Sequence, residues 1–253
     1  MLCIYRSVSG YTIQKDDSFS IAANFCFDEL FDCPDPLDYV QSRFREGEPS
    51  IRPEGHLLPP LGSQEIWAAG VTYFRSRDAR MEESESSGGD RFYDLVYEAE
   101  RPELFFKATP NRCRGHLDKV CIRSDSSWDV PEPELTLAIS SMGQVFGYTI
   151  GNDMSSRSIE GENPLYLPQA KVYKGSCAIG PCLVVGSLPG AQAKITIEIQ
   201  RGDDLAFSGE TEVAQIKRSF EELAQFLFRD NEFPHGALLM TGTGVVPDSG
   251  FTL

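Results

Sequence analysis

Two apolar runs that flank a Met142-Gly143 dipeptide constrain the fold of this chain more than any other part of its sequence. The runs cover residues 135–139 and 145–150, and the first alternates with a period of two, which is typical of a β-strand. The Met-Gly step between them predicts a tight turn, and therefore a hairpin. Glu132 and Glu134 are expected to share one face of the first strand, opposite the leucines and the isoleucine of that run.

The predicted turn also fixes which residues of the two strands lie opposite each other. With Met142-Gly143 as a two-residue turn, Ser141 faces Gln144, and counting outward places Glu132 across from Asp153. The Cβ atoms of directly opposed residues lie roughly 4.5–5.5 Å apart, so two like charges in these positions repel each other unless a cation neutralises them.

Glu132, Glu134 and Asp153 are therefore candidate metal ligands. Carboxylate oxygens suit a hard cation, Mg²⁺ first and Mn²⁺ or Ca²⁺ as alternatives, better than zinc, which prefers His and Cys. The competing interpretation is a solvated acidic surface, because the chain contains 38 Asp and Glu residues and a Glu-x-Glu pair arises easily. The hairpin pattern favours the metal site.

The composition restricts the kinds of partner that the chain can bind. Its 253 residues are 41% hydrophobic and 24% charged, which is enough for a globular protein with a large core. A net charge of −15 argues against nucleic acids and anionic membranes, although a bound cation still permits an anionic small molecule.

The location expected from the sequence is the cytoplasm. No apolar run approaches the roughly 18 residues of a membrane span, and the first residues show no basic segment followed by an apolar one. Seven cysteines without a Cys-x-x-Cys spacing favour reduced thiols over a disulfide framework or a zinc site.

Residues 1–62 are expected to form a small N-terminal domain, because prolines and a glycine in residues 53–62 interrupt the pattern that follows. One helix is expected over residues 35–46, where apolar side chains fall on one stripe. The remaining residues, 63–253, are expected to form a single catalytic domain. Strands and helices are mixed and strands dominate, so the predicted fold class is α+β.

The middle of the chain contains two segments of uncertain role. A buried strand at residues 67–71 leads into a polar stretch with a Ser-Ser-Gly-Gly tract at residues 86–89, which is either an ordinary loop or a lid over a ligand. A helix is expected at residues 90–98. Glu103 and Lys107 then flank a Phe pair, either as surface charges or as groups whose pKa values burial shifts for proton transfer.

The remaining elements are expected as follows: strands at residues 117–123, 178–186 and 237–240, a hairpin over residues 193–208, and a helix that begins at the capping box of Ser219 and Glu222. Lys171 lies among apolar neighbours, where it either extends its amine to solvent or, desolvated near a metal, acts as a base. Thr241-Gly242-Thr243 offers backbone N–H groups to an anion, or is simply a turn.

Taken together, residues 70–247 resemble the fumarylacetoacetate hydrolase family. The Glu-x-Glu and Gly-Asn-Asp metal motifs of the family are matched by the three acids named above, and its following lysine by Lys171. Its Pro-x-x-Phe-x-Lys segment matches Pro102, Phe105 and Lys107, and its Thr-Gly-Thr substrate loop matches Thr241, Gly242 and Thr243. The resemblance implies a mixed, largely antiparallel β-roll catalytic domain, Mg²⁺ dependence, and a homodimer or a dimer of dimers.

The sequence departs from the hydrolases of this family at their Asn-Tyr-x-x-His motif, which reads Thr72-Tyr73-Phe74-Arg75-Ser76 here. This departure argues against hydrolysis of a carbon–carbon bond. The sequence is more similar to the sugar-acid branch of the family, which implies that Glu103 acts as an acid/base and that Arg75, Ser76 and Arg77 contact the substrate. Members of the family also continue for several strands past the position of Leu253.

The resemblance implies dehydration of a 2-oxo-3-deoxy sugar acid, from 2-dehydro-3-deoxy-D-arabinonate to 2,5-dioxopentanoate and water. Lys171 is the candidate base at C3, and Glu103 is the candidate acid that protonates the departing C4 hydroxyl. Two alternatives stay open. One is hydrolysis or decarboxylation of a 2,4-dioxo acid such as an acylpyruvate on the same metal, and the other is a non-catalytic protein that binds oxo acids.

Overall fold

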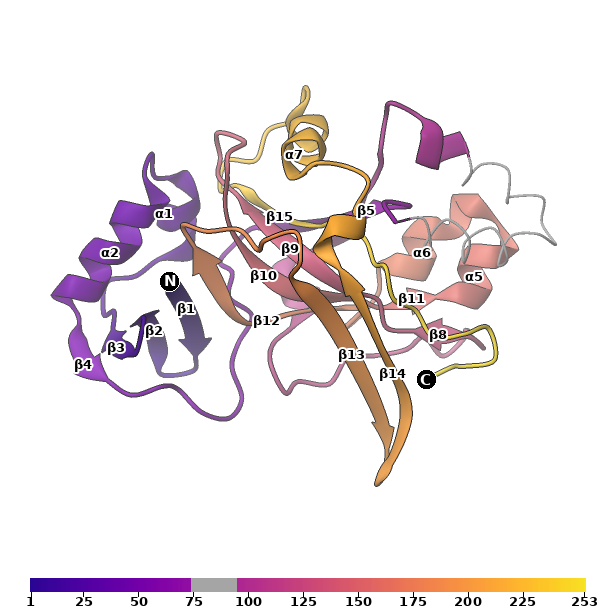
Figure 1. The fold of residues 1–253 in the computed structure, drawn as a ribbon, viewed down its shortest axis with the longest axis horizontal. Helices are drawn as coiled ribbons and strands as arrows, with labels where there is room; N and C mark the ends of the chain where they lie inside the picture. The colour runs from indigo at the N-terminus through magenta and orange to yellow at the C-terminus, as the bar shows by residue number, and fades with distance from the viewer. Residues whose placement is uncertain (74–94) are drawn as a thin grey trace.

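One large mixed sheet runs through the molecule, and two smaller pairs of strands lie beside it (Figure 1). The computed structural model describes residues 1–73 and 95–253. In this part of the chain the large sheet has eleven strands. Ten of them lie side by side in this order: β4 (Glu48–Ser50), β3 (Ser18–Ile21), β2 (Gly10–Lys15), β1 (Leu2–Ser7), β12 (Cys177–Val185), β10 (Val145–Asp153), β9 (Pro133–Ile139), β15 (Ala237–Met240), β5 (Glu65–Gly70) and β6 (Glu103–Ala108). The eleventh, β7 (Cys113–Arg114), pairs with β12.

The first 62 residues continue this sheet, because β1 pairs antiparallel with β12. Helices α1 (Phe27–Asp32) and α2 (Pro36–Glu46) lie beside β1 to β4 (Figure 1). The predicted helix over residues 35–46 is confirmed, and it begins where the Asp35 carboxylate accepts a hydrogen bond from the backbone N–H of Asp38. The domain boundary near residue 62 stays a prediction.

The predicted hairpin is present, but its turn differs from the expected one. The backbone N–H of Ser140 donates to Gln144 O at 2.9 Å, so three residues, 141–143, form the loop instead of two. Gly143 lies at φ +77°, which favours glycine. The one-residue offset would have moved every side chain to the other face.

A β-bulge between Val145 and Gly147 cancels this offset. Beyond the bulge, Gly151 pairs with Glu134, and the backbone N–H of Asp153 donates to Glu132 O at 2.9 Å. The predicted opposition of Glu132 and Asp153 is therefore confirmed, although the turn from which it was counted is one residue longer.

The sheet is covered on both faces by apolar clusters. The outward leucines and isoleucine of β9 belong to the cluster under α7 (Phe220–Phe228), whereas Ala138 belongs to the cluster that contains the apolar side chains of α1. Helix α7 begins after Ser219, whose side chain accepts a hydrogen bond from the backbone N–H of Glu222, as the capping box predicted. Strand β9, the first strand of the hairpin, is buried on both faces and is therefore held rigidly in place.

One expectation about local structure is wrong, and one strand was not predicted. Residues 103–107 were given no secondary structure in the sequence analysis, and they lie in β6, which pairs antiparallel with β5. Residues 117–123 were expected to be a strand, but they contain only turns and irregular backbone. The predicted helix over residues 90–98 lies mostly outside the described residues, and residues 95–98 are helical.

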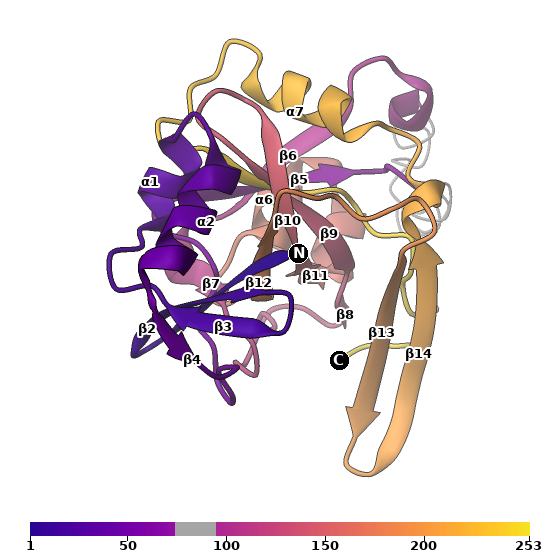
Figure 2. The same cartoon turned by 60° about the vertical axis from the view of Figure 1, so that its left-hand side comes forward.

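Several short elements complete the described structure. The hairpin of β13 (Lys194–Arg201) and β14 (Asp204–Glu212) reaches away from the large sheet (Figure 2). The others are β8 (Asp129–Val130) paired with β11 (Ser155–Ser156), helices α5 (Arg157–Glu162) and α6 (Leu167–Lys171), and 3-10 turns η2 (Pro110–Arg112), η3 (Pro164–Tyr166) and η4 (Val213–Gln215). Among the described residues, no helix has the length and apolar character needed to span a bilayer.

Candidate active site

Five strands of the large sheet bring their ends together at one edge. Strands β5 and β15 are parallel, so their carboxyl ends meet there, and β10 ends at the same edge. Strands β9 and β6 run antiparallel to their neighbours and begin at this edge. The sequence positions just outside these strand ends therefore converge, although they are far apart along the chain.

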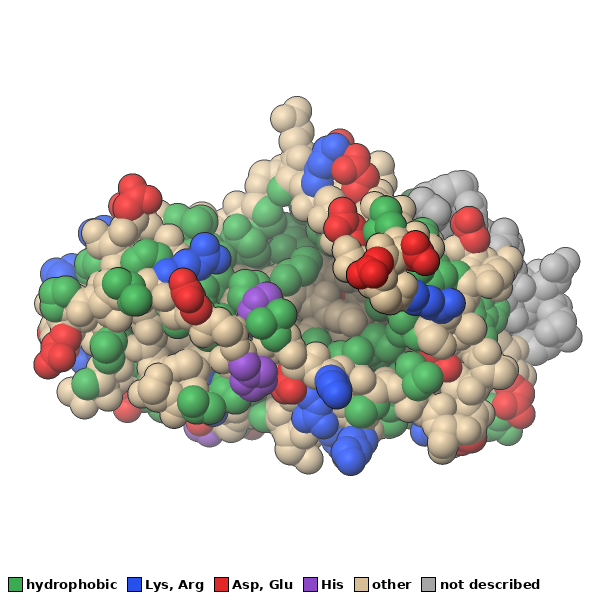
Figure 3. Space-filling model, turned by 90° about the horizontal axis from the view of Figure 1, so that it is seen from below, with side chains coloured by type: hydrophobic (Ala, Val, Ile, Leu, Met, Phe, Trp, Pro, Cys, Tyr) green, Lys and Arg blue, Asp and Glu red, His purple; other side chains and the backbone are tan. Residues whose placement is uncertain are grey.

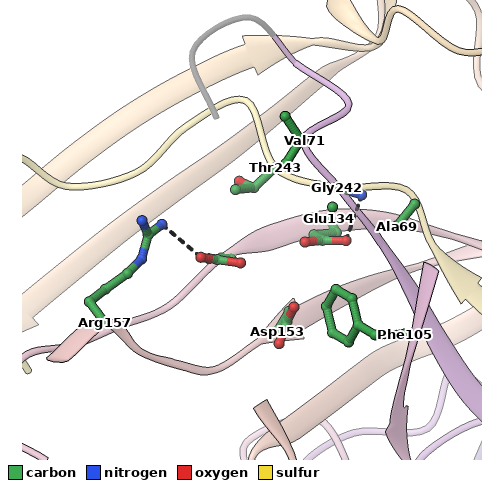
Figure 4. Close-up of a pocket in the computed structure, with 10 residues that line it drawn as sticks. Ala69, Val71, Phe105, Glu134, Asp153, Arg157, Gly242 and Thr243 are labelled. Carbon is green, nitrogen blue, oxygen red and sulfur yellow. Dashed lines mark hydrogen bonds and ion pairs between the residues drawn. The ribbon is translucent and has the colours of Figure 1, made fainter. Parts of the chain in front are cut away.

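A small cavity lies at this edge (Figure 4). Ten residues line it: Ala69, Gly70, Val71, Phe105, Glu132, Glu134, Asp153, Arg157, Gly242 and Thr243. They come from the ends of β5, β6, β9, β10 and β15 and from the first turn of α5. The cavity combines an acidic floor with apolar walls and one guanidinium group.

Glu132, Glu134 and Asp153 offer three carboxylate oxygen atoms that all lie within 4.8 Å of one another. All three side chains are buried. Burial raises the pKa of Glu134 well above its usual value, and the negative charges of Asp153 and Glu132 raise it further. Carboxylates that are buried and repel each other are the donor set that a hard divalent cation neutralises, so these residues fit Mg²⁺.

Lys171 lies against this acid triad from the last turn of α6. Its Nζ lies 2.7 Å from Glu132 Oε2 and 3.0 Å from Asp153 Oδ2, and the side chain has no solvent exposure. The ring of Phe105 lies over the ammonium, with 5.6 Å from Nζ to the ring centroid. The structure therefore brings the predicted base and the predicted metal ligands into contact.

Lys107 of β6 also contacts the triad, through Asp153. Its Nζ lies 2.5 Å from Asp153 Oδ1, and it donates hydrogen bonds to Met154 O at 2.9 Å and to Lys171 O at 2.5 Å. Lys107 was expected to contact the substrate. Its ammonium is instead enclosed by protein groups, and Lys107 is not one of the residues that line the cavity.

Glu103 is the first residue of β6, directly opposite Gly70 of β5. A Cβ atom at position 70 would overlap Glu103 Oε2, so the carboxyl group of Glu103 fits here because residue 70 is a glycine. Gly70 lines the cavity. The predicted acid therefore lies at the rim of the site, next to the wall that Gly70 forms.

The segment after β15 contributes backbone groups to the site. Thr241 is fully buried, and its backbone N–H and its Oγ1 both donate to Leu135 O, at 2.9 and 3.0 Å. The backbone N–H of Gly242 donates to Glu134 Oε2 at 2.7 Å. Gly242 and Thr243 line the cavity, whereas Thr241 anchors the segment to β9.

Arg157 is a site residue that the sequence did not predict. Its Nη2 lies 2.7 Å from Glu132 Oε1, its side chain is buried, and it lines the cavity (Figure 4). Only its position four residues after Asp153, at the start of a helix, could have indicated this. Three predicted substrate contacts, Arg75, Ser76 and Arg77, lie outside the described residues.

Comparisons with known proteins identify the family of the chain. Residues 81–250 match the family model described as fumarylacetoacetate (FAA) hydrolase C-terminal. The chain is 48% identical over 200 residues to a probable 2-keto-3-deoxyxylonate dehydratase of Haloferax volcanii, covering 78% of this chain and 68% of the relative. It is 44% identical over 194 residues to 2-dehydro-3-deoxy-D-arabinonate dehydratase of Saccharolobus solfataricus, covering 76% of this chain and 65% of the relative. These alignments span about two thirds of the length of each relative.

A solved structure of 2-keto-3-deoxy-D-arabinonate dehydratase complexed with magnesium and 2,5-dioxopentanoate has the same fold. Its TM-score is 0.83 at 33% identity, and the match covers 100% of this chain and 90% of that chain. The predicted α+β, strand-rich fold is thereby confirmed. The expected enzyme class, a lyase, is also confirmed, because both curated relatives are dehydratases.

Proposed function

Because the chain belongs to the fumarylacetoacetate hydrolase family, we propose that it is a magnesium-dependent dehydratase of a 2-oxo-3-deoxy sugar acid. The observation that carries this proposal is the buried triad of Glu132, Glu134 and Asp153 in contact with Lys171. The relatives named above favour 2-dehydro-3-deoxy-D-arabinonate as substrate and 2,5-dioxopentanoate as product.

The three carboxylates would hold Mg²⁺ at the floor of the cavity. When bound, the ion supplies positive charge next to the carboxylate and 2-oxo oxygens of the substrate, where negative charge develops during loss of the C3 proton. The hydrogen bond from Gly242 N–H to Glu134 and the ion pair from Arg157 to Glu132 fix two of these carboxylates in place.

Lys171 is the group that receives the C3 proton at its Nζ. For this role the amine has to be neutral at the moment of transfer, whereas its contacts with the Glu132 and Asp153 carboxylates favour the charged form. Neutralisation of those carboxylates therefore favours the base form of Lys171. General base catalysis of this kind contributes typically about 10²- to 10⁴-fold.

Glu103 is the group that gives a proton to the C4 hydroxyl as the C4–O bond breaks, so that the oxygen leaves as water. The half-buried position beside Gly70 supports this role, because a carboxyl group removed from water keeps its proton more readily. Tautomerisation of the resulting unsaturated alcohol then gives the aldehyde end of 2,5-dioxopentanoate.

The substrate is oriented by groups on the cavity wall. Arg157 presents a guanidinium group to the acidic end of the substrate, and Gly242 and Thr243 line the cavity with it. Phe105 provides an apolar side. Arg75, Ser76 and Arg77 remain proposed contacts by resemblance.

The test is turnover of an oxo-acid panel followed by mass spectrometry, with Mg²⁺ or with EDTA. We expect 2-oxo-3-deoxy pentonates and hexonates to lose water, about 18 mass units, only when Mg²⁺ is present. Lys171→Ala should lower kcat by at least roughly 10². Faster consumption of an acylpyruvate would favour the hydrolase or decarboxylase, and binding without turnover of any panel member would favour a non-catalytic oxo-acid-binding protein.

A further inference from the structure

Thr72 lies two residues after Gly70, the last residue of β5, and it is completely buried. Its Oγ1 donates a hydrogen bond of 2.6 Å to Thr241 O, 169 positions further along the chain. Its own carbonyl oxygen accepts from Lys217 N–H at 3.0 Å. The side chain and the backbone of Thr72 are therefore both held by distant segments.

Thr72 also occupies the space above Gly242. A Cβ atom at position 242 would overlap Thr72 Oγ1 and would lie 3.0 Å from Ala69 O, and Gly242 has a φ of +90°. The two residues interlock, because the Thr72 hydroxyl occupies the space that a side chain at position 242 would need. Gly242 is the residue whose N–H donates to Glu134 Oε2.

The backbone conformation of Val71 places Thr72 in this position. Val71 has a φ of +53°, a conformation that a β-branched residue rarely adopts and that costs of order 1–3 kcal/mol. Val71 is buried and lines the cavity. Strain of this kind persists only where the surroundings impose it, and here Thr241 and Lys217 fix the residue that follows.

We propose that Thr72 is a positioning residue for the metal site: its hydroxyl holds the segment after β15 so that the Gly242 N–H points at Glu134. The route runs through two hydrogen bonds, from Thr72 Oγ1 to Thr241 O and from Gly242 N to Glu134 Oε2. Both lie in the buried interior, where an outer hydrogen bond orients a ligand most strongly. This inference rests on the proposed function, because it assigns Glu134 to Mg²⁺.

The test compares Thr72→Val, which removes the hydroxyl and keeps the shape, with Thr72→Ser, which keeps the hydroxyl. Isothermal titration of metal-free protein with MgCl₂ should show an affinity about 10- to 100-fold weaker for Thr72→Val. Thr72→Ser should stay within about threefold of the unchanged protein, since its donor is retained. Equal affinities of Thr72→Val and the unchanged protein would overturn the proposal, as would an equal loss in Thr72→Ser.

Thr149→Val is the matched control. Thr149 is also a buried threonine whose Oγ1 donates to a backbone carbonyl, but its acceptor is Gly180 O, at 3.4 Å, and not the segment that binds Glu134. Its Mg²⁺ affinity should be unchanged. A weakening equal to that of Thr72→Val would show a general loss of packing and would overturn the proposal.

A second pair of variants keeps the proposal testable if Thr72→Val does not fold. Gly242→Ala should weaken Mg²⁺ binding, because its Cβ displaces the Thr72 hydroxyl. In a Thr72→Ala background that collision is removed, so Gly242→Ala should cost less there than in the unchanged protein. Additive losses would contradict the interlock.

Dehydration measured on the same samples separates this inference from the proposed function. An unchanged protein that binds Mg²⁺ but dehydrates no 2-oxo-3-deoxy acid would refute the proposed function. The titrations of the Thr72 variants would still decide whether Thr72 positions the metal site. Normal dehydration together with full Mg²⁺ affinity in Thr72→Val would refute only the role of Thr72. An unchanged protein without Mg²⁺ affinity would refute both.

Discussion

Lys107 carries a positive charge in a place that no water reaches. Its ammonium contacts Asp153 Oδ1 and two backbone carbonyl oxygens, those of Met154 and Lys171. A buried charge is tolerated only when each of its donors finds an acceptor, and here the three acceptors come from the end of β10 and the end of α6. Lys107 therefore links the strand that carries a metal ligand to the helix that carries the proposed base.

Removal of this charge should be costly. In Lys107→Met the Asp153 carboxylate loses one of its two lysine partners inside the protein, and breaking one partner of a buried pair costs about 3–5 kcal/mol. Urea denaturation should show this loss in the free energy of unfolding. The control is Lys194→Met, which removes an ion pair of 2.7 Å to Glu210 between half-exposed side chains and should leave the midpoint unchanged. Equal midpoints for the two variants would contradict a buried structural role for Lys107.

At the scale of single residues, the sequence predicted the acid triad but not all of its neighbours. Glu132, Glu134 and Asp153 could be found because a period of two and a hairpin register are local properties of the sequence. Arg157 could not, because an arginine in a polar stretch gives no sign that folding buries it. Lys107 was identified as a functional residue, but its sequence neighbours do not determine on which side of the acids its ammonium lies.

At the scale of elements, the register of the hairpin was predictable and its turn was not. The register is set by burial on both faces of β9, which tolerates no slip. A three-residue loop at residues 141–143 combined with a bulge after Val145 gives the same register as a two-residue turn without a bulge. A Met-Gly step does not distinguish these two solutions. The strand β6 was missed for a similar reason, because its pairing partner β5 is more than 30 positions away.

Arg218 binds the carbonyl groups at the C-terminal end of the helix that includes residues 95–98. Its guanidinium group donates to the carbonyl oxygens of Val96, Ala99 and Glu100, at 3.3, 2.6 and 2.9 Å, and pairs with Glu222 at 2.6 Å. The carbonyl groups at the end of a helix have no partner within the helix, so a buried cation satisfies them. Three residues later the chain reaches Glu103.

Arg218→Ala should therefore destabilise the protein and displace the start of β6. Several hydrogen bonds from a charged group are lost at once, which predicts a cost of about 3 kcal/mol or more in urea denaturation. Arg218→Lys should recover only part of this stability, since one ammonium cannot reach all of these acceptors. A variant with unchanged stability would show that water replaces the guanidinium group at the helix end.

At the scale of the whole molecule, the acidic side chains on the face seen in Figure 3 are not gathered at one place. The view in Figure 3 shows acidic, basic and apolar side chains interspersed around a hollow in that face. The net charge of −15 thus acts mainly through solubility and weak self-repulsion. The buried triad differs from these surface acids, because the protein interior screens its charges far less than water does.

Binding of Mg²⁺ should therefore stabilise the entire fold. A ligand that binds only the folded state adds RT ln(1 + [L]/Kd), about 2.7 kcal/mol at a concentration of 100 Kd. We expect the Tm to rise with MgCl₂ and to fall back with EDTA. In Glu134→Gln this rise should be much smaller, because one of the three ligands is neutral. A rise of equal size in this variant would place the stabilising ion elsewhere.

The size of this stabilisation should depend on pH. Burial and the neighbouring acids raise the pKa of Glu134 in the metal-free fold, so Glu134 favours folding at low pH, and this contribution is lost as the pH rises through its folded-state pKa. Mg²⁺ needs the carboxylate, so binding at low pH first has to release the proton. The rise in Tm caused by MgCl₂ should therefore grow as the pH increases above the usual titration range of a glutamate, as measured by differential scanning calorimetry. In Glu134→Gln the remaining rise should vary much less with pH, because the group with the raised pKa is absent. A pH dependence as steep in Glu134→Gln as in the unchanged protein would show that another group controls the site.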